Sequence, residues 1–154
     1  MPDVLAIANA NAGSSTEEAQ DTALNVLRKG LDVTMVSTSS PDDLEQALSD
    51  HPDITTVVVL GGDGSLHAVV AALHAAGRLG DVTVGLVPMG TGNDYARSID
   101  LPLEPDAAAR VVIDGHVQDV DLVFDGNDMV VVNAAHVGIG AEAAAKAKPW
   151  KKVL

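Results

Sequence analysis

Residues 57–73 change from a strand pattern to a helix pattern across a run of glycines, and no other stretch constrains the fold as much. Residues 57–60 read Val-Val-Val-Leu, an apolar run typical of a strand that is buried on both faces. Glycines then interrupt the run, and apolar residues recur at helical spacing, at Leu66, Val69, Val70 and Leu73. A strand, a glycine turn and a helix in this order direct backbone N–H groups beyond the strand's carboxyl end, where a phosphate can bind.

Asp63 is the only charged residue in this glycine turn. A carboxylate beside a phosphate is repelled unless a metal ion or a transferring proton lies between them. The turn therefore indicates either a nucleotide with Mg²⁺ or an acid–base role for Asp63. The alternative is that the glycines only let the helix pack closely against its strand.

A second glycine turn follows a second apolar strand, which we expect at 82–87. Residues 88–94 read Pro-Met-Gly-Thr-Gly-Asn-Asp. Turns that follow two strands of one parallel sheet lie at the same edge, so the two turns are expected side by side. Gly92 can supply any positive φ that this turn needs. Arg97, the only cation near either turn, is expected either to contact phosphate or to pair with a nearby acid.

Together the segments VVLGGDGSLHAVV and GLVPMGTGNDYARSIDLP resemble the catalytic domain of the diacylglycerol kinase family, which includes sphingosine kinases and bacterial lipid kinases. The second segment is the more specific, because the related NAD kinases and phosphofructokinases carry turns like GGDG. The resemblance implies ATP and Mg²⁺ as cofactors and transfer of the γ-phosphoryl group to a lipid hydroxyl.

The resemblance also implies a set of site residues. In the family an Asn-Pro-x-Ser/Ala-Gly turn follows the first strand, and this chain keeps its first and last residues. The implied nucleotide-binding residues are Asn9, Gly13, Gly61, Gly62, Gly64, Ser65, Gly90, Thr91, Gly92, Asn93 and Arg97, and Asp63 is the catalytic and metal-binding candidate. The aspartate that matches Asp63 is the base in sphingosine kinases, whereas bacterial diacylglycerol kinases place the base in their second domain.

Two residues depart from the family pattern. Ala10 replaces the proline of the first turn, and Ala68 stands where the family usually has a glutamate. If that glutamate helps to hold nucleotide or metal, this chain lacks one anchor.

The remaining pattern alternates strands and helices, which predicts a three-layer α/β/α domain with a mostly parallel sheet. Further strands are expected at 5–8 and 33–36, and further helices at 15–27, from Pro41 to about His51 with Ser40 as its N-cap, at 95–99 and at 105–114. Asn93 or Asp94 is expected to cap the helix at 95–99. His67 and His74 are seven residues apart, too far to share one metal ion, and both are expected to face solvent.

An antiparallel hairpin is predicted after this domain. Strands at 117–124 and 129–134 flank the turn Asp-Gly-Asn-Asp. We therefore divide the chain into a nucleotide-binding α/β domain at 1–115 and, at 116–154, a hairpin that begins a second, truncated β domain. The resemblance covers essentially the whole chain but only the first half of a typical family member. The chain alone is expected not to phosphorylate lipid, and its unpaired hairpin edge is expected to favour a homodimer.

Composition restricts the partners and the compartment. The net charge of −13 argues against nucleic acid as a partner. The absence of cysteine fits the cytoplasm, and no apolar run is long enough for a transmembrane segment. These features fit a cytoplasmic protein, and the resemblance implies that it meets a lipid substrate at the membrane surface. Two other functions stay open: an NAD kinase-like enzyme, and a nucleotide-binding fragment without catalytic activity.

Overall fold

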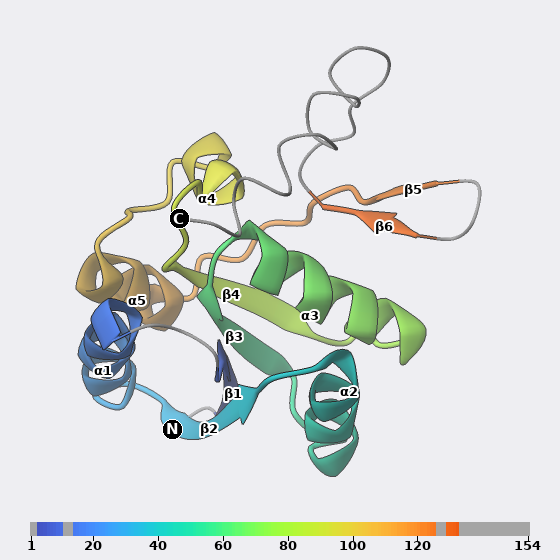
Figure 1. Ribbon diagram of the computed structural model, residues 1–154, viewed down its shortest axis with the longest axis horizontal. Coiled ribbons are helices and arrows are strands. Elements are labelled where there is room, and N and C mark those ends of the chain that lie inside the picture. The colour runs from blue at the N-terminus through green and yellow to red at the C-terminus, as the bar shows by residue number, and fades with distance from the viewer. Residues whose placement is uncertain (1–2, 11–13, 126–128, 133–154) are drawn as a thin grey trace.

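Four parallel strands form the central sheet of this chain. The computed structural model describes residues 3–10, 14–125 and 129–132 (Figure 1). The sheet consists of β1 (Asp3–Asn9), β2 (Asp32–Thr38), β3 (Thr56–Gly61) and β4 (Thr83–Pro88), in the order β2-β1-β3-β4. All four predicted strands are present, each within three residues of the predicted bounds, and the predicted parallel sheet is confirmed.

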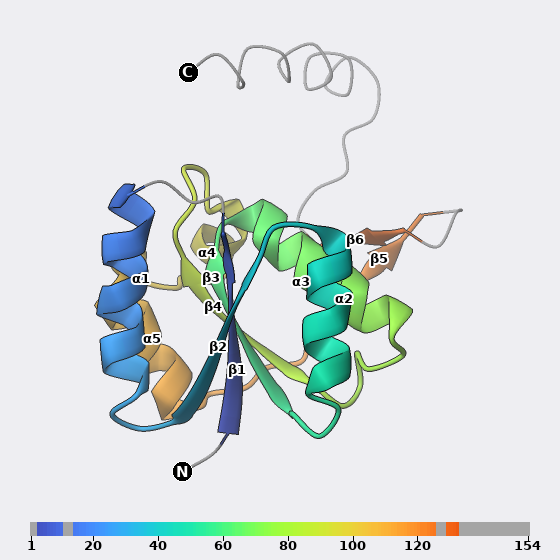
Figure 2. The same cartoon turned by 60° about the horizontal axis from the view of Figure 1, so that its bottom comes forward.

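Helices cover both faces of this sheet, as Figure 2 shows. On one side lie α1 (Ser14–Leu27) and α5 (Pro105–Asp114), and on the other lie α2 (Pro41–Asp50) and α3 (Asp63–Ala75). A short helix, α4 (Asp94–Ser98), follows β4. The predicted three-layer α/β/α arrangement is therefore confirmed.

β3 supplies the core on both faces, because successive side chains of a strand point to opposite sides. Val57 and Val59 pack with the apolar residues of α2 and α3, whereas Val58 and Leu60 pack with those of α1 and α5. All four side chains are almost completely buried. The apolar run in the sequence thus marks the centre of the fold.

The order of the strands creates a crevice at the carboxyl end of the sheet. β1 is followed by α1 on one face, whereas its neighbour β3 is followed by α3 on the other face. The chain therefore leaves β1 and β3 toward opposite faces of the sheet. Such a place is a topological switch point, and ligands of open α/β sheets bind there. The glycine turn after β3 lies beside it.

The helix starts follow the sequence closely, with one difference. Ser40 caps α2, its side chain and that of Asp43 form a reciprocal capping box, and Pro41 occupies the first turn. α3 begins at Asp63, three residues before the predicted apolar stripe at Leu66. The first turn of α3 is therefore made by the glycine turn itself.

The predicted hairpin is present, but its strands are shorter than predicted. β5 (Val123–Phe124) pairs antiparallel with β6 (Val130–Val131), and Asp125 and Met129 close the turn through their backbone and side-chain atoms. Residues 117–122 are not a strand, because no described strand lies beside them to accept and donate the ladder hydrogen bonds. Residues 133 and 134 of the second predicted strand lie outside the described part.

The hairpin packs against α3 and corrects one expectation. His67 is exposed as expected, but His74 is partly buried, and its ring lies 4.8 Å from the ring of Phe124, centroid to centroid. β5 thus contacts the C-terminal end of α3, a contact that the sequence pattern did not predict. In the described part of the chain, no helix has both the length and the apolar character needed to cross a bilayer.

Candidate functional site

The two glycine turns meet directly at the carboxyl end of the sheet. A Cβ atom built on Gly62 would lie 2.9 Å from the Cα atom of Gly90, so only glycines allow the two backbones to approach so closely. The backbone N–H of Met89 also donates to the carbonyl oxygen of Gly61, at 3.0 Å. The structure therefore brings together the turn residues Gly61, Gly62, Asp63, Gly64 and Ser65 with Gly90, Thr91, Gly92 and Asn93.

Asp63 connects these turns through its side chain. Its Oδ2 accepts a hydrogen bond from the N–H of Asp94 at 3.0 Å, and its Oδ1 accepts one from the N–H of Tyr95 at 2.9 Å. These are the first two N–H groups of α4, so Asp63 caps this helix from another element. Asn93 is the N-cap residue of α4, one of the two predicted, but its side chain makes no capping hydrogen bond.

Asn93 instead closes the second turn. Its Oδ1 accepts the N–H of Gly90 at 2.9 Å, and its Nδ2 donates to the carbonyl oxygen of Gly90 at 2.7 Å. Asn93 itself adopts the left-handed conformation, with φ 51°, which asparagine tolerates better than most residues. The positive φ of this turn therefore lies at Asn93 and not at Gly92.

Two carboxylates lie beside Gly92. A Cβ atom on Gly92 would be 3.4 Å from Oδ2 of Asp63 and 3.6 Å from Oδ2 of Asp94. Mg²⁺ is commonly held by one or two carboxylates together with substrate phosphates, so this donor pair fits such an ion. In the described part of the chain no group of three or more acidic, histidine or cysteine side chains could form a site of its own.

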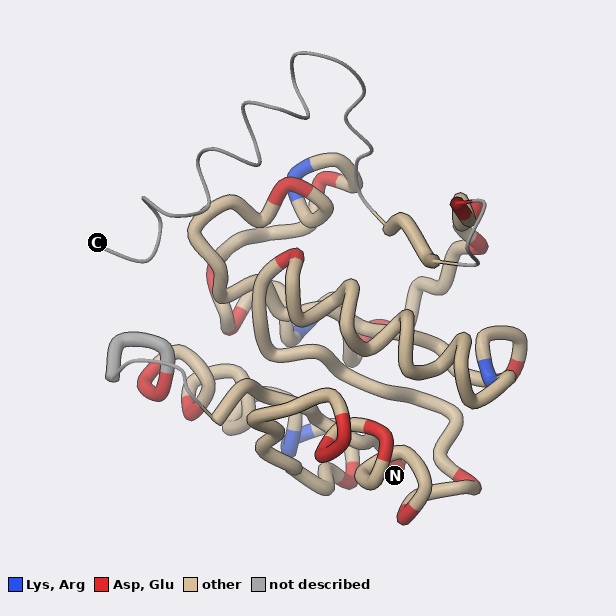
Figure 3. The backbone as a smooth tube through the Cα atoms, turned by 45° about the vertical axis from the view of Figure 1, so that its right-hand side comes forward, with Lys and Arg blue, Asp and Glu red and all other residues tan. Residues whose placement is uncertain are grey.

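Arg97 lies next to the same turn. Its Nε donates to the carbonyl oxygen of Gly92 at 3.1 Å, and its side chain is exposed. The backbone therefore holds Arg97, and among the described residues no ion pair joins it to an acid. Figure 3 shows acidic residues on many of the surrounding segments and few basic ones. Few basic side chains near the turns could therefore offset the negative charge of a phosphate.

A cavity of about 210 Å³ lies at the carboxyl end of the sheet, at the switch point. Asn9, at the end of β1, lines it together with Gly64 and Ser65 from the first turn of α3. A Cβ atom on Gly64 would meet no other atom within 4 Å, so the glycine leaves open space there. Gly13 lies outside the described residues. Gly90, Thr91, Gly92, Asn93 and Arg97 do not line this cavity.

The opposite wall of this cavity was not predicted from the sequence. It consists of residues at the β2–α2 junction, namely Thr38, Ser39, Ser40 and Pro41. The sequence pattern identified Ser40 only as a helix cap. A run of hydroxyl side chains after a strand was the available signal, but its position beside Asn9 depends on β2 lying next to β1.

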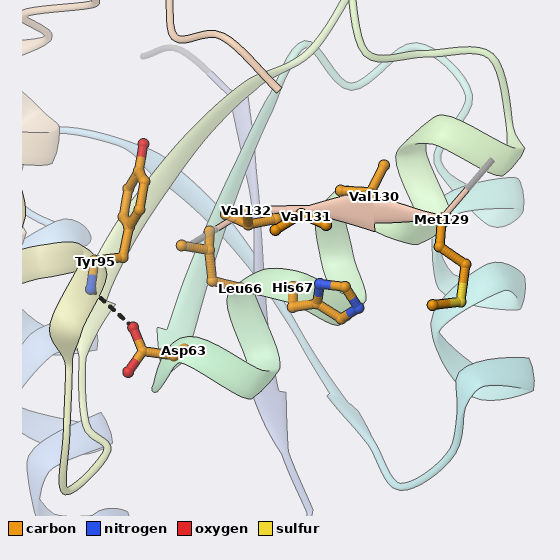
Figure 4. A pocket seen from close by; sticks show the side chains of 8 residues that line it. All are labelled: Asp63, Leu66, His67, Tyr95, Met129, Val130, Val131 and Val132. Carbon is orange, nitrogen blue, oxygen red and sulfur yellow. Dashed lines mark hydrogen bonds between the residues drawn. The ribbon is translucent and has the colours of Figure 1, made fainter. Parts of the chain in front are cut away.

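A second cavity, of about 320 Å³, lies on the other side of the first turn of α3. Figure 4 shows its lining: Leu66 and His67 of α3 lie beside residues 129–132, which contain β6, and the Asp63 carboxylate points toward the backbone N–H of Tyr95. Valines and Met129 make this lining mostly apolar. Asp63 therefore stands between a mainly apolar cavity and the glycine turns.

Comparison with known proteins places this geometry in one family. The profile of the diacylglycerol kinase catalytic domain matches residues 3–124. A "Probable lipid kinase YegS-like" from Pseudomonas aeruginosa is 39% identical over 112 residues, which are 72% of this chain and 35% of that protein. Another protein with this name, from Yersinia enterocolitica, is 26% identical over 142 residues, 91% of this chain and 48% of that protein.

A solved structure is similar as well. The crystal structure of a diacylglycerol kinase from Bacillus anthracis str. Sterne superposes with a TM-score of 0.68 at 25% identity, over 78% of this chain and 42% of that chain. This chain thus spans between a third and a half of the length of these relatives.

Proposed function

This chain belongs to the diacylglycerol kinase catalytic domain family, and from that premise we propose that it supplies the nucleotide-binding part of an ATP-dependent lipid kinase. The protein would transfer the γ-phosphoryl group of ATP to a lipid hydroxyl. The names of its relatives support a lipid as the acceptor.

The cavity at the switch point is the observation that carries the nucleotide site. It lies where open α/β sheets bind ligands, and the first turn of α3 forms one of its walls through Gly64 and Ser65. N–H groups at the start of an α-helix have no partner within the helix, and together they favour a phosphate. The space above Gly64 supports the phosphate position, because any side chain at this residue would occupy it.

Asp63 is the proposed catalytic and metal-binding residue. A carboxylate can accept about four hydrogen bonds, and two of those of Asp63 come from α4. Its place beside the mainly apolar cavity suits an acceptor whose hydroxyl must meet the phosphate near the glycine turns. With Mg²⁺ bound, Asp63 and Asp94 would hold the ion, and its charge would offset that of the phosphates.

We also propose that the molecule divides into two domains, since the matched part of this chain covers only 35% and 48% of the length of two relatives. Residues 1–115 would bind nucleotide, and 116–154 would begin a second domain that faces the lipid at the membrane surface. The antiparallel hairpin of β5 and β6, which follows the parallel sheet, supports a boundary near residue 115.

Calorimetry with ATP and Mg²⁺ tests the nucleotide site, using two matched glycine variants. Gly64→Val places two methyl groups in the cavity, whereas Gly80→Val adds the same group in the loop between α3 and β4, where a Cβ atom also meets nothing within 4 Å. We expect Gly64→Val to abolish binding and Gly80→Val to preserve it. Equal binding by both variants would place the nucleotide elsewhere.

The acceptor is tested with a protein that contains this chain and the remaining length found in its relatives. We expect labelled phosphate to pass from ATP to diacylglycerol in mixed vesicles and not to NAD⁺. Transfer to NAD⁺ alone would replace the lipid kinase assignment with an NAD kinase.

A further inference from the structure

The wall of the switch-point cavity that β2 and α2 provide contains a serine whose hydroxyl hydrogen is already engaged. Ser39 lines the cavity, and its Oγ–H donates to Oδ2 of Asp43 at 2.6 Å. The same carboxylate oxygen accepts the N–H of Ser39 at 2.8 Å and the N–H of Ser40 at 3.1 Å. One oxygen therefore fixes both the backbone and the side chain of Ser39.

This arrangement determines which partner Ser39 can take. A serine hydroxyl has one hydrogen to donate and two lone pairs to accept with. Since Asp43 takes the hydrogen, Ser39 offers only lone pairs to the cavity. A ligand group that meets Ser39 must therefore be a hydrogen-bond donor.

The walls of the cavity also set the direction of a nucleotide. The phosphate end belongs at Gly64 and Ser65, where the first turn of α3 provides N–H groups. Thr38, Ser39 and Ser40 form the facing wall at the end of β2, so the nucleoside end lies against them. Adenine has an exocyclic amino group that can donate, whereas hypoxanthine has a carbonyl oxygen at the same position.

We propose that Asp43 is a positioning residue that acts through Ser39 and makes this pocket select an amino purine. Asp43 does not line the cavity, and it acts by holding the Ser39 hydroxyl as an acceptor for the amino group of adenine. The proposal rests on the proposed nucleotide site and adds to it a basis for choosing ATP. The pKa of Asp43 is lowered, first by the side-chain hydrogen bond from Ser39, which keeps the carboxylate ionised and accepting.

The test compares the binding of ATP and ITP by the whole chain, measured by calorimetry with Mg²⁺. Ser39→Ala should weaken ATP about three- to tenfold, the effect of one neutral hydrogen bond, and leave ITP unchanged. Asp43→Ala should lower the preference for ATP over ITP by a similar factor, because the freed hydroxyl can turn and donate to the carbonyl of hypoxanthine. Asp43→Glu should restore the preference, because glutamate suits this position of a capping box.

Asp42→Ala is the matched control. Asp42 precedes Asp43 in the first turn of α2, is exposed, and its removal changes the net charge by the same amount. We expect it to leave the preference for ATP intact. A purely structural effect of Asp43 would weaken ATP and ITP equally.

Three outcomes would overturn the proposal. Equal weakening of both nucleotides in Ser39→Ala would mean that the contact is to ribose or phosphate, and unchanged binding of both would mean that there is no contact. In either case the nucleotide site itself would stand. If the unmodified chain bound neither ATP nor ITP, the proposed nucleotide site and this inference would fail together.

Discussion

Gly62 and Gly90 lie in van der Waals contact through their backbones, although they belong to different glycine turns. A Cβ atom on Gly90 would lie 2.8 Å from the Cα atom of Gly62 and 2.9 Å from Oδ1 of Asn93. Neither residue needs a left-handed φ, so the requirement for glycine comes from the contact alone. The turns after β3 and β4 are thus one rigid unit on which Asp63 and Asp94 are placed.

Gly90→Ala is predicted to destabilise the chain by about 1–3 kcal/mol, because backbone and not a flexible side chain must move to make room. Gly64→Ala is the control, since its Cβ atom would meet nothing within 4 Å and alanine favours a helix. This control should keep or raise stability. Urea denaturation followed by circular dichroism measures both, and equal stability of the two variants would mean that the turns are not in fixed contact.

Asp63→Asn is predicted to lower stability as well as activity. Asparagine keeps one acceptor oxygen, and its amide group would face one of the two N–H donors of α4, which costs about 1–3 kcal/mol. Asp94→Asn removes the same charge but keeps the backbone N–H of Asp94, so its stability should match that of the parent chain. Urea denaturation again gives the comparison.

The catalytic role of Asp63 needs the longer protein. As a general base it should account for a factor of about 10²–10⁴ in turnover, lost in Asp63→Asn. As a magnesium ligand, its loss should also weaken the dependence of nucleotide binding on Mg²⁺. Turnover and metal dependence close to those of the parent would assign Asp63 a structural role only.

The sequence alone predicted those strands, helices and caps whose residue pattern spans only a few neighbouring positions. The buried run at 57–60, the stripe from Leu66 to Leu73 and the cap at Ser40 each depend on neighbours within a few residues. They therefore predicted the strands, the helices and the alternation that gives a three-layer fold. The glycine turns were found for the same reason.

The parallel sheet predicted that the two glycine turns would lie side by side, but the side-chain contacts between distant parts of the chain could not be predicted. Asp63 caps a helix that begins 31 residues later, and this pairing exists only once β3 and β4 are adjacent. Ser39 reaches the cavity only because β2 pairs with β1. The lengths of β5 and β6 likewise depend on which strands lie beside them.

The capping box of α2 gives a prediction about pH. The pKa of Asp43 is lowered from the model-peptide value of 3.8, chiefly by the side-chain hydrogen bond from Ser39 and then by the backbone N–H of Ser39. A folded pKa below the unfolded one means that Asp43 stabilises the fold above about pH 4, and that this contribution is lost as the pH falls through the folded pKa.

Asp43→Ala should therefore be less stable than the parent at pH 7, and the difference should shrink as the pH falls below 3.8. Denaturant titrations of both proteins at several pH values measure this. Asp42→Ala serves as the control, because Asp42 takes no part in the capping box. A difference between parent and Asp43→Ala that stays constant with pH would show that Asp43 acts by packing and not through its charge.

The hairpin predicts self-association of this chain. Val123 is 61% exposed and Met129 63% exposed, and β5 and β6 pair only with each other among the described strands. Apolar side chains beside an unpaired strand edge favour pairing with a second copy, which would give a symmetric dimer.

The net charge of −13 opposes this pairing, but at about 0.15 M salt the Debye length is only about 8 Å, so the repulsion is screened. Burial of apolar surface is not screened, and association should therefore strengthen as salt is added. Replacing Val123 and Met129 by Lys should abolish it, whereas Val111→Lys, an exposed position on α5, should not. Light scattering at low and high salt measures the mass of each form, and a monomer at both salts would refute the dimer.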